Sequence, residues 1–401
     1  MCDDDQQYTR RDLIQLMGLW AGAQLCMPLG AIAAPHQAAI TQSHPRVRIG
    51  YIPITDATPL LVAYQNKLFQ QQGLAVDPPV LFRSWAQLIE AFLSGSVNVI
   101  HLLSPMAVWT RFSSRFPAKI VAWNHVAGSA LTVQKHIHSI EALGGHYVAI
   151  PFWYSVHNVV LQAMLRHAGL RVITKPDQEL GPKDVGLIVL APSDMPPALV
   201  SGQIAAYLVA EPFNAMAEHL KIGKILRFTG DVWKQHACCV VFMHERDLAE
   251  RPEWTQKVVN SIVQAQHWCR QHRGETAQLL SREHQPRLTP HIHAVLAQVL
   301  QPGAAKYQAY LRQGAIKHSH WPLARIDFQP YPFESYSIEL IKRMRETLVE
   351  GNRVFLNQLD PVQAARQLVD DRFVKKAIQA LGGMQAFGLP DSFQRQEVFQ
   401  L

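Results

Sequence analysis

The sequence predicts an α/β protein of two lobes that are joined by two crossings of the chain and followed by a C-terminal helical extension. Three observations support this fold class. At 401 residues the chain exceeds the usual size of one hydrophobic core, which favours two compact units. Short β-branched runs alternate with helical periods in two successive cycles. Two strand-like segments, residues 130–134 and 238–243, separate the cycles and lie far apart in the sequence.

The composition and the N-terminus indicate a soluble globule behind an export signal. Hydrophobic residues make up 48% of the chain and charged residues 17%, which is typical of neither a disordered nor a membranous chain. Arg10 and Arg11 precede a weakly apolar run from Leu13 to Ala33, the layout of a twin-arginine signal peptide. We therefore expect residues 1–33 to be cleaved near Ala33 and the mature protein to be periplasmic. An amphipathic N-terminal helix retained in the cytoplasm is the alternative.

The first cycle predicts the first lobe, residues 46–129. Apolar β-branched runs bounded by turn residues indicate its strands, and helical periods indicate its helices. We expect the strands to form an open parallel sheet. The expected order is strand 47–52, helix 59–72, strand 75–81, helix 85–93, strand 97–103, a helix from about 105 and strand 118–123.

The second cycle predicts a lobe of similar plan, residues 130–237. The two strand-like segments between the lobes are expected to pair with each other as a two-stranded hinge. The elements of this lobe are expected as strand 147–150, helix 155–168, strand 186–190, helix 195–201, strand 205–209, helix 213–219 and strand 224–229.

The remainder is mostly helical. Residues 238–334 are predicted to contain the return crossing and helices that pack on the first lobe, and residues 335–401 a C-terminal helical extension. Prolines interrupt 282–331, which we expect to wrap the first lobe irregularly. The expected helices are 253–271, 275–281, 335–348 and 361–381.

Charge and cysteines exclude some classes of function. The net charge is +7, but Lys and Arg are scattered without a basic run or a recognisable binding motif, so no nucleic-acid partner is predicted. Without the leader, Cys238, Cys239 and Cys269 remain, an odd number that argues against a disulfide framework. We interpret them as small buried hydrophobic residues. A monomer is expected.

Two lobes joined by two crossings predict a small-molecule site in the cleft, where strand ends and helix starts converge. In the first lobe, Thr55 and Asp56 lie in the turn after the first strand, at a helix start that would offer free amides to a polar or anionic ligand. Trp85 follows the second strand, and Ser104 follows the third. A plain helix cap at Asp56 and a core position for Trp85 are the alternatives.

The second lobe offers further candidates at corresponding positions. Phe152 and Trp153 occupy a strand-to-helix turn, where aromatic side chains are costly to leave in water. His157, near the helix start, would stay neutral and make a single hydrogen bond. Glu211 places a carboxylate at a later helix start, and Lys234 could supply a cation near the return crossing. A helix cap at Glu211 and a solvated Lys234 are the alternatives.

The sequence predicts no catalytic residues, no cofactor and no metal. It contains no Gly-rich phosphate loop, nucleophile elbow or zinc-protease motif, so we expect no enzyme. The pairs His291/His293 and His318/His320 lack a nearby carboxylate or cysteine at a known ligand spacing.

Several motifs together resemble the nitrate/bicarbonate/sulfonate-type ABC-transporter solute-binding proteins, a group that includes thiamine-pyrimidine precursor proteins. The resemblance implies a periplasmic-binding-protein-like clamp (type II) that closes by hinge motion and delivers its solute to an ABC permease in the inner membrane. It runs from Val47 to about Cys269 and rests on GYIPITDATPL at 50–60, SW at 84–85, LSPM at 103–106, EPFN at 211–214 and GDVWK at 230–234.

The resemblance also implies residues of the site. In nitrate binders of this family a Trp, a Gln, a His and a Lys surround the anion, which by position implies Trp85, His157 and Lys234, with Ser129 where the Gln would fall. The bulky turn at residues 152–154 departs from the family pattern. The resemblance favours a small anion as the solute, and these two departures leave open whether it is nitrate.

A second comparison concerns the return crossing. Residues 236–242 lie where fungal thiamine-pyrimidine synthases, which are enzymes of this fold, have a Cys-rich motif, but only two cysteines match. This departure argues against iron-dependent chemistry. An aromatic heterocycle as ligand, a cytoplasmic sensor of the same fold and a synthase remain the alternatives.

Overall fold

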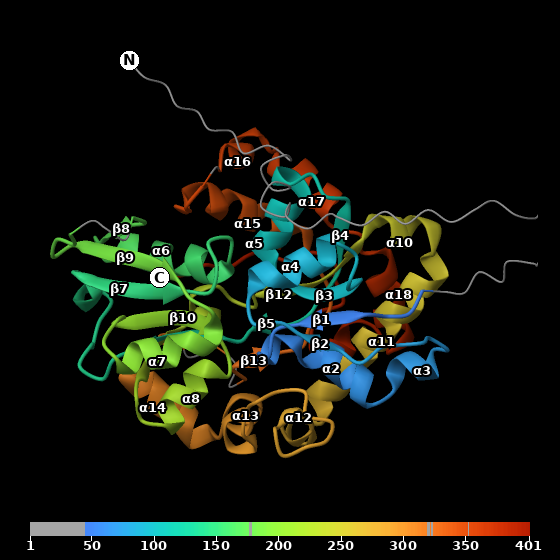
Figure 1. Ribbon diagram of the computed structural model, residues 1–401, viewed down its shortest axis with the longest axis horizontal. Helices are drawn as coiled ribbons and strands as arrows, with labels where there is room; N and C mark the ends of the chain where they lie inside the picture. Colours follow the sequence, from blue (N-terminus) through green and yellow to red (C-terminus); the bar gives the residue numbers. More distant parts are fainter. Residues whose placement is uncertain (1–44, 176–178, 319–320, 322–323, 352) are drawn as a thin grey trace, which may run out of the picture. The chain divides into compact units, whose positions relative to one another are not determined.

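A computed structural model describes residues 45–175, 179–318, 321, 324–351 and 353–401 (Figure 1). The predicted signal peptide, residues 1–33, and His320 lie outside this part of the chain. The described residues pack as one compact unit that contains two main β-sheets. We call each sheet, with the helices packed on it, a lobe. The predicted two-lobed α/β fold is confirmed.

The first lobe is built on a five-stranded sheet in the order β2-β1-β3-β12-β4. Strand β1 is parallel to β2 and β3, whereas β12 lies antiparallel between β3 and β4. The expectation of an all-parallel sheet is therefore wrong, because the return crossing enters this sheet. The strands are β1 (Ile49–Tyr51), β2 (Val80–Leu81), β3 (Val99–Leu103), β4 (Ala118–Trp123) and β12 (Cys239–His244).

Helices of the first lobe follow its strands. Helix α4 has the predicted bounds, and the Ser84 hydroxyl accepts the Gln87 N–H at its start, 3.3 Å away. The helix predicted at 59–72 is two helices, because Lys67 adopts a left-handed conformation with φ of 57°. The helices are η1 (Thr55–Ala57), α2 (Thr58–Gln65), α3 (Leu68–Gln71), α4 (Trp85–Leu93), α5 (Ser104–Val108) and the π-helical η2 (Trp109–Ser113).

The second lobe is built on a six-stranded sheet in the order β11-β6-β10-β7-β9-β8. Four of its strands are mutually parallel, and β6 is antiparallel to both of its neighbours. The strands are β6 (Ser129–Val133), β7 (His146–Ile150), β8 (Arg171–Ile173), β9 (Asp184–Val189), β10 (Ala206–Ala210) and β11 (Lys224–Phe228). The helices are η3 (Glu141–Leu143), α6 (Val156–His167), η4 (Pro192–Asp194), α7 (Met195–Val200), α8 (Phe213–His219) and α9 (Thr229–Val232).

The two crossing strands do not pair with each other, contrary to the prediction. Each lies inside a different sheet, where β6 and β12 find backbone partners on both sides. The crossings touch just before these strands, through a bridge between Val126 and Ala237 and a 2.9 Å hydrogen bond from the Ala127 N–H to the His236 carbonyl. A short strand β5 (Val126–Ala127) also pairs with β13 (Ile326–Asp327). The hinge is therefore shorter than expected.

The C-terminal half is helical, as predicted, but it contacts both lobes. The segment 282–331 contains α13, which packs on α8, and α14, whose Tyr310 ring meets Phe228 of β11. Residues 282–292 do contact the first lobe without regular structure, where the Tyr51 hydroxyl donates to the Leu288 carbonyl at 2.6 Å, but α13 and α14 in the rest of the segment are helical and reach the second lobe. The helices are α10 (Glu245–Glu250), α11 (Pro252–Gln271), α12 (Arg273–Leu280), α13 (His293–Leu300), α14 (Ala304–Gln313), α15 (Glu334–Glu346), α16 (Val354–Gln358), α17 (Pro361–Leu368), α18 (Arg372–Ala380) and η5 (Met384–Phe387).

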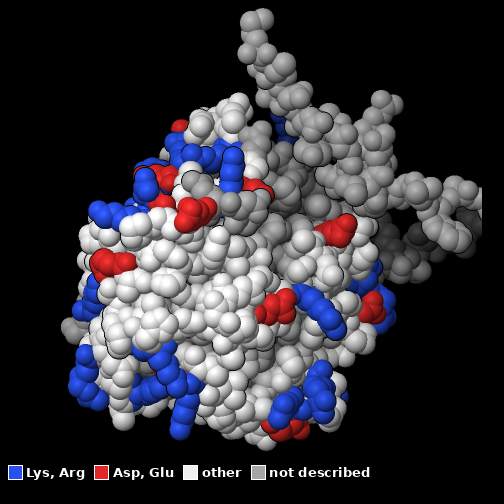
Figure 2. Space-filling view, turned by 60° about the vertical axis from the view of Figure 1, so that its left-hand side comes forward, with Lys and Arg blue, Asp and Glu red and all other residues white. Residues whose placement is uncertain are grey.

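The surface of the described residues shows charges of both signs. Figure 2 shows Lys and Arg interspersed with Asp and Glu over the face it draws, without one continuous basic area. Within the part of the chain that the structure describes, no helix has both the length and the apolar character that a membrane span requires.

Candidate functional site

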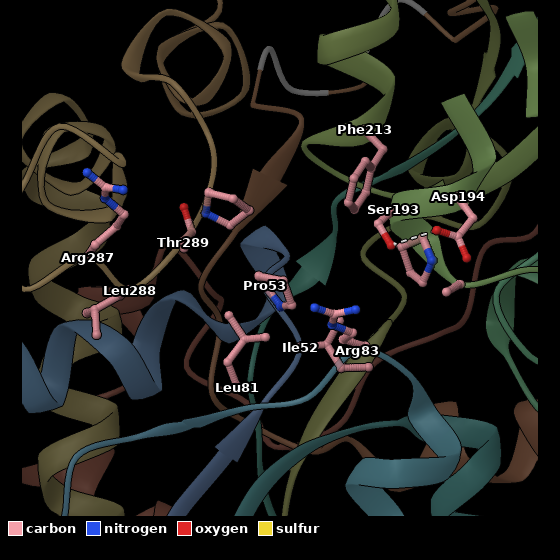
Figure 3. Close-up of a pocket in the computed structure, with 13 residues that line it drawn as sticks. Ile52, Pro53, Leu81, Arg83, Ser193, Asp194, Phe213, Arg287, Leu288 and Thr289 are labelled. Atoms are coloured by element: carbon pink, nitrogen blue, oxygen red, sulfur yellow. Dashed lines mark hydrogen bonds between the residues drawn. The ribbon is translucent and has the colours of Figure 1, made fainter. Parts of the chain in front are cut away.

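A cavity of about 520 Å³ opens between strand ends of both lobes (Figure 3). The first lobe contributes residues that follow β1 and β2, the second lobe residues around η4 and the start of α8, and the loop after α12 completes the wall. Its volume lies within the usual range for small-ligand pockets, roughly 300–1,000 Å³. The lining residues are Ile52, Pro53, Leu81, Arg83, Ala191, Pro192, Ser193, Asp194, Phe213, Arg287, Leu288, Thr289 and Pro290.

Two arginines give this cavity a cationic character. Arg83 precedes α4 and Arg287 belongs to the loop after α12, and both side chains reach solvent. Asp194 is the one carboxylate in the lining set, and it accepts a hydrogen bond from the Ser193 hydroxyl at 3.2 Å. An anion that entered the cavity could therefore meet guanidinium groups from two separate segments.

A second polar site is completely buried and lies at the crossings. We call Asp56, His125, Cys238 and Cys239 the hinge cluster. One ligand-type atom from each residue lies within 4.8 Å of the others. The Cys239 thiol donates to Asp56 Oδ2 at 3.1 Å, and His125 Nε2 lies 2.9 Å from the same oxygen. All four residues are fully buried.

Three chain segments deliver these side chains. Asp56 lies in η1 after strand β1, His125 lies between β4 and β5 on the first crossing, and the cysteines lie where the return crossing enters β12. The η1 turn is held against the second lobe, because the Thr55 N–H and hydroxyl both donate to the Glu211 carbonyl at 2.9 Å. The return crossing is held by the Ser104 N–H, which donates to the Cys238 carbonyl at 3.0 Å.

Histidines from both lobes flank the hinge cluster. His157 Nε2 of α6 lies 2.9 Å from the Ser129 hydroxyl and 3.6 Å from Cys238 Sγ. On the other side, His101 Nε2 of β3 accepts the Ile52 N–H at 2.9 Å. The Trp85 ring packs edge-on against the His101 ring, with 5.3 Å between centroids.

Burial and mutual charge shift the titration of this region. Burial raises the pKa of Asp56 to about 6 despite the opposing effect of His125. Burial alone would lower the pKa of His125, but the Asp56 carboxylate outweighs it and raises the pKa to about 10. The pKa of Cys238 falls well below its ordinary value, because hydrogen bonds and nearby histidines outweigh burial, whereas burial raises the pKa of Cys239. The four groups of the hinge cluster thus influence one another's protonation.

Several buried polar atoms around the hinge cluster have no hydrogen-bond partner among the described residues. Buried polar groups are normally satisfied, so a group of such atoms at one place requires an explanation. His125 Nε2 is among them, because its contact with Asp56 has the distance of an ion pair without hydrogen-bond alignment. The atoms are Asp56 Oδ1, Trp85 Nε1, His101 Nδ1, Asn124 Oδ1, His125 Nδ1, His125 Nε2, His157 Nδ1 and His236 Nε2.

Five of the sequence-predicted residues lie at or beside the hinge cluster. Asp56 belongs to it, and Ser129 and His157 contact Cys238. Trp85 packs on its periphery through His101, and the Ser104 hydroxyl donates to the Ala237 carbonyl at 2.8 Å. None of the ten predicted residues lines the 520 Å³ cavity.

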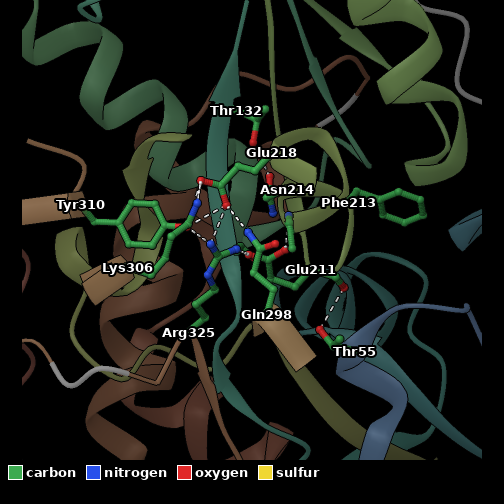
Figure 4. A network of polar contacts seen from close by, with 12 residues as sticks. Thr55, Thr132, Glu211, Phe213, Asn214, Glu218, Gln298, Lys306, Tyr310 and Arg325 are labelled. Carbon is green, nitrogen blue, oxygen red and sulfur yellow. Dashed lines mark hydrogen bonds and ion pairs between the residues drawn. The ribbon is translucent and has the colours of Figure 1, made fainter. Parts of the chain in front are cut away.

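Glu211 faces a different network, shown in Figure 4. Its carboxylate pairs with the buried Arg325 at 2.8 Å and accepts the Ala215 N–H at 3.0 Å. Arg325 also pairs with Glu218 at 2.6 Å and contacts Tyr310 of α14. Glu211 therefore holds α8 and the C-terminal half together instead of reaching the cavity or the hinge cluster.

Lys234, Phe152 and Trp153 also lie away from both sites. Lys234 is exposed, and its backbone N–H donates to the Val398 carbonyl at 2.9 Å. Trp153 donates through Nε1 to Glu350 at 3.2 Å, and Phe152 is half-buried against the hydrophobic core. The anion cage implied for Trp85, His157 and Lys234 is therefore not assembled, because the exposed Lys234 lies away from the other two.

The histidine pairs have separate structural contacts. His291 Nε2 contacts the Pro53 carbonyl at 2.6 Å, and His293 is exposed. His318 contacts Asp231, and its predicted companion His320 lies outside the described residues.

Sequence reasoning missed His125 and the polar role of Cys238 and Cys239. His125 lies more than a hundred positions before the two cysteines, so no local ligand spacing identifies the three residues as one site. The available signal was an adjacent cysteine pair on the return crossing, because that crossing brings the chain back to the first lobe near the end of β1.

The sequence is similar to one family model and to several curated proteins. The sequence model described as the NMT1-like family matches residues 41–281. The nitrate/nitrite-binding protein NrtA of Nostoc sp. is 26% identical over 245 residues, which covers 56% of this chain and 54% of that protein. The chain thus spans about half the length of the curated relatives it matches.

Two solved structures have a similar fold. The periplasmic nitrate-binding protein NrtA of Synechocystis superposes with a TM-score of 0.69 at 17% identity, covering 88% of this chain and 93% of that one. The periplasmic aliphatic sulphonate-binding protein SsuA of Escherichia coli superposes with a TM-score of 0.55 at 18% identity, covering 82% and 93%.

Proposed function

The chain belongs to the NMT1-like family, and on this premise we propose that it is the solute-binding component of an ABC importer. It captures a small anion between its two lobes and delivers it to a permease in the inner membrane. It performs no chemistry on the solute. Relatives named for nitrate binding and a structural neighbour named for sulphonate binding support a nitrate-, bicarbonate- or sulfonate-like anion.

The 520 Å³ cavity carries this proposal. It opens where strand ends of both lobes converge, which is where open α/β sheets bind ligands. Arg83 comes from the first lobe, Ser193 from the second and Arg287 from the loop after α12, so a bound anion would connect all three. A ligand that contacts both sides of a hinge stabilises the closed arrangement.

The twin-arginine leader, residues 1–33, supports export to the periplasm. After export and cleavage of the leader, the mature protein is a periplasmic monomer whose N-terminus lies near Ala34. N-terminal sequencing of protein from the periplasmic fraction tests this part. An intact Met1 in cytosolic protein would favour a cytoplasmic sensor of the same fold.

A thermal-shift screen tests solute capture. Nitrate, nitrite, bicarbonate, alkanesulfonates and pyrimidines are added separately to metal-free protein, because a ligand that binds only the folded state raises its melting temperature. We expect a small anion to raise it. A response to pyrimidines alone would replace the anion with an aromatic heterocycle, and turnover of a heterocyclic precursor would support a synthase.

A further inference from the structure

We propose that the hinge cluster is a zinc site in which Asp56, His125, Cys238 and Cys239 bind one Zn²⁺ ion. The site is separate from the solute cavity, because none of these residues lines that cavity. The inference therefore does not depend on which solute the protein carries.

The donor set matches the chemistry of zinc. Thiolate sulfur, imidazole nitrogen and carboxylate oxygen are the atoms that bind Zn²⁺ in proteins, and four protein ligands are the rule at structural sites. Magnesium and calcium prefer oxygen alone, and iron–sulfur clusters of the common kind need four cysteines. Two sulfurs, one nitrogen and one oxygen favour zinc among the common metals.

The geometry is close to that of a bound site. Zinc–ligand bonds of roughly 2.0–2.3 Å place tetrahedral ligand atoms about 3.3–3.8 Å apart. The four candidate atoms already lie within 4.8 Å of one another, and Asp56 Oδ2 lies 2.9 Å from His125 Nε2 and 3.1 Å from Cys239 Sγ. To bind the ion, the 2.9 Å and 3.1 Å contacts would lengthen and the longest separations would shorten toward the tetrahedral spacing.

An unpartnered buried atom is an independent observation. Asp56 Oδ1 is fully buried and lacks a hydrogen-bond partner among the described residues, and the partner of His125 Nε2 is the other oxygen of the same carboxylate, in an ion pair at 2.9 Å. Both residues belong to the four that converge here. An ion bound at this point would give Asp56 Oδ1 the partner that buried polar groups require.

The same donor set disfavours two other occupants. The buried Asp56 carboxylate would repel an anion, and the exposed Lys234 does not approach to compensate. A disulfide between Cys238 and Cys239 would close a strained ring between adjacent residues. The two sulfurs instead have separate partners, Asp56 for Cys239 and His157 for Cys238.

The ion would join the turn after β1 to both crossings. Two of these segments are the crossings between the lobes, so zinc would tie their first-lobe ends to the turn after β1 while the cavity outside the site remains open to solute. His157, from the second lobe, lies 3.6 Å from Cys238 Sγ and would act as an outer partner of that ligand.

Metal binding to the full chain tests the site. Metal-free protein, kept reduced, is titrated with Co²⁺ as a spectroscopic probe and then with Zn²⁺ in competition with a chromophoric chelator. We expect one equivalent to bind, with an intense thiolate-to-cobalt absorption band. We expect Cys239→Ser and Asp56→Asn to weaken Zn²⁺ binding by about 100-fold or more, since even outer partners typically change affinity 10–100-fold.

Cys269→Ser is the matched control, because Cys269 is equally buried but lies on α11, outside the hinge cluster. It should bind Zn²⁺ as the wild type does. Circular dichroism identifies any variant that fails to fold. The cobalt spectrum of the wild-type protein tests for thiolate ligands without the use of any variant. A spectrum without the thiolate band, or wild-type Zn²⁺ affinity in folded Cys239→Ser and Asp56→Asn, would overturn the proposal. That result would leave the proposed function untouched, because solute binding is measured separately on metal-free protein.

Discussion

The thiol of Cys239 lies 3.1 Å from Asp56 Oδ2, although 183 positions separate the two residues in the chain. Cys239 begins the strand that returns to the first sheet, and Asp56 follows the first strand of that sheet. Their contact connects the return crossing to the turn whose Thr55 is hydrogen-bonded to Glu211 of the second lobe. The hinge is therefore anchored by buried polar groups as well as by apolar packing.

Zinc should stabilise the folded protein. An ion that binds the native state at a hundred times its dissociation constant adds about 2.7 kcal/mol to the free energy of unfolding. Urea unfolding of reduced protein with and without Zn²⁺ measures this gain. Cys269→Ser should show the same gain and Asp56→Asn a much smaller one, and equal curves with and without Zn²⁺ in the wild type would speak against the site.

Arg325 should be essential for stability. It is buried and pairs with Glu211 and Glu218, so Arg325→Met leaves the buried Glu211 carboxylate without its cation, whereas Glu218 keeps Lys306 at 3.2 Å. Breaking a buried pair in this way costs about 3–5 kcal/mol. Urea denaturation compares it with Arg312→Met on the exposed side of α14, which should cost little. Adding Glu211→Gln to Arg325→Met should restore part of the loss, and a purely additive loss would contradict this interpretation.

Gly128 should tolerate no side chain. It joins the first crossing to β6 at φ of +82°, and an added Cβ would lie 3.0 Å from Ile326 and 3.3 Å from His125. Gly73 has a similar φ of +73° but open space around it, so Gly73→Ala isolates the backbone cost. We expect Gly128→Ala to be destabilised by at least about 1 kcal/mol more than Gly73→Ala in urea unfolding. Equal losses would mean that the crossing can shift to accommodate a methyl group.

His291 should make stability depend on pH. Burial lowers the pKa of His291, so the folded protein keeps it neutral while the unfolded chain takes up a proton below about pH 6.5. Its contribution is complete above that pH and is lost as the pH falls. His291→Gln should reduce the slope of unfolding free energy between pH 7 and 5 by up to about 1.4 kcal/mol per pH unit. The matched control, His219→Gln at an exposed position, should keep the wild-type slope, and an unchanged slope in His291→Gln would refute the assignment.

Local elements could be predicted well because local patterns determine them. The apolar period and the Ser84 cap define α4, and the β-branched run from Ala118 to Trp123 defines β4. The break at Lys67 could not be predicted, because a left-handed lysine leaves no sequence signal when no glycine or proline is present. The pairing of the crossing strands was also beyond local patterns, since β6 and β12 each insert between two strands that are distant from them in sequence.

The candidate site was predictable only in part. Strand-exit logic brought Asp56 and His157 to one place, because ends of parallel strands in both lobes meet at the crossings, and the family resemblance added Ser129. His125 and the cysteines were missed because their proximity depends on how β12 inserts into the first sheet. Arg83 and Arg287 were missed because the cavity wall is completed by a loop whose position depends on the packing of α12 and α13.

Calorimetric titration of the cavity with the anion that gives the largest thermal shift tests the central claim most directly. Arg83→Ala removes a guanidinium from the cavity, whereas Arg312→Ala removes one from exposed α14. We predict that Arg83→Ala weakens binding about tenfold or more, the value of one charge-assisted hydrogen bond, and that Arg312→Ala binds as the wild type does. Wild-type affinity in folded Arg83→Ala, or no heat with any anion, would contradict the account.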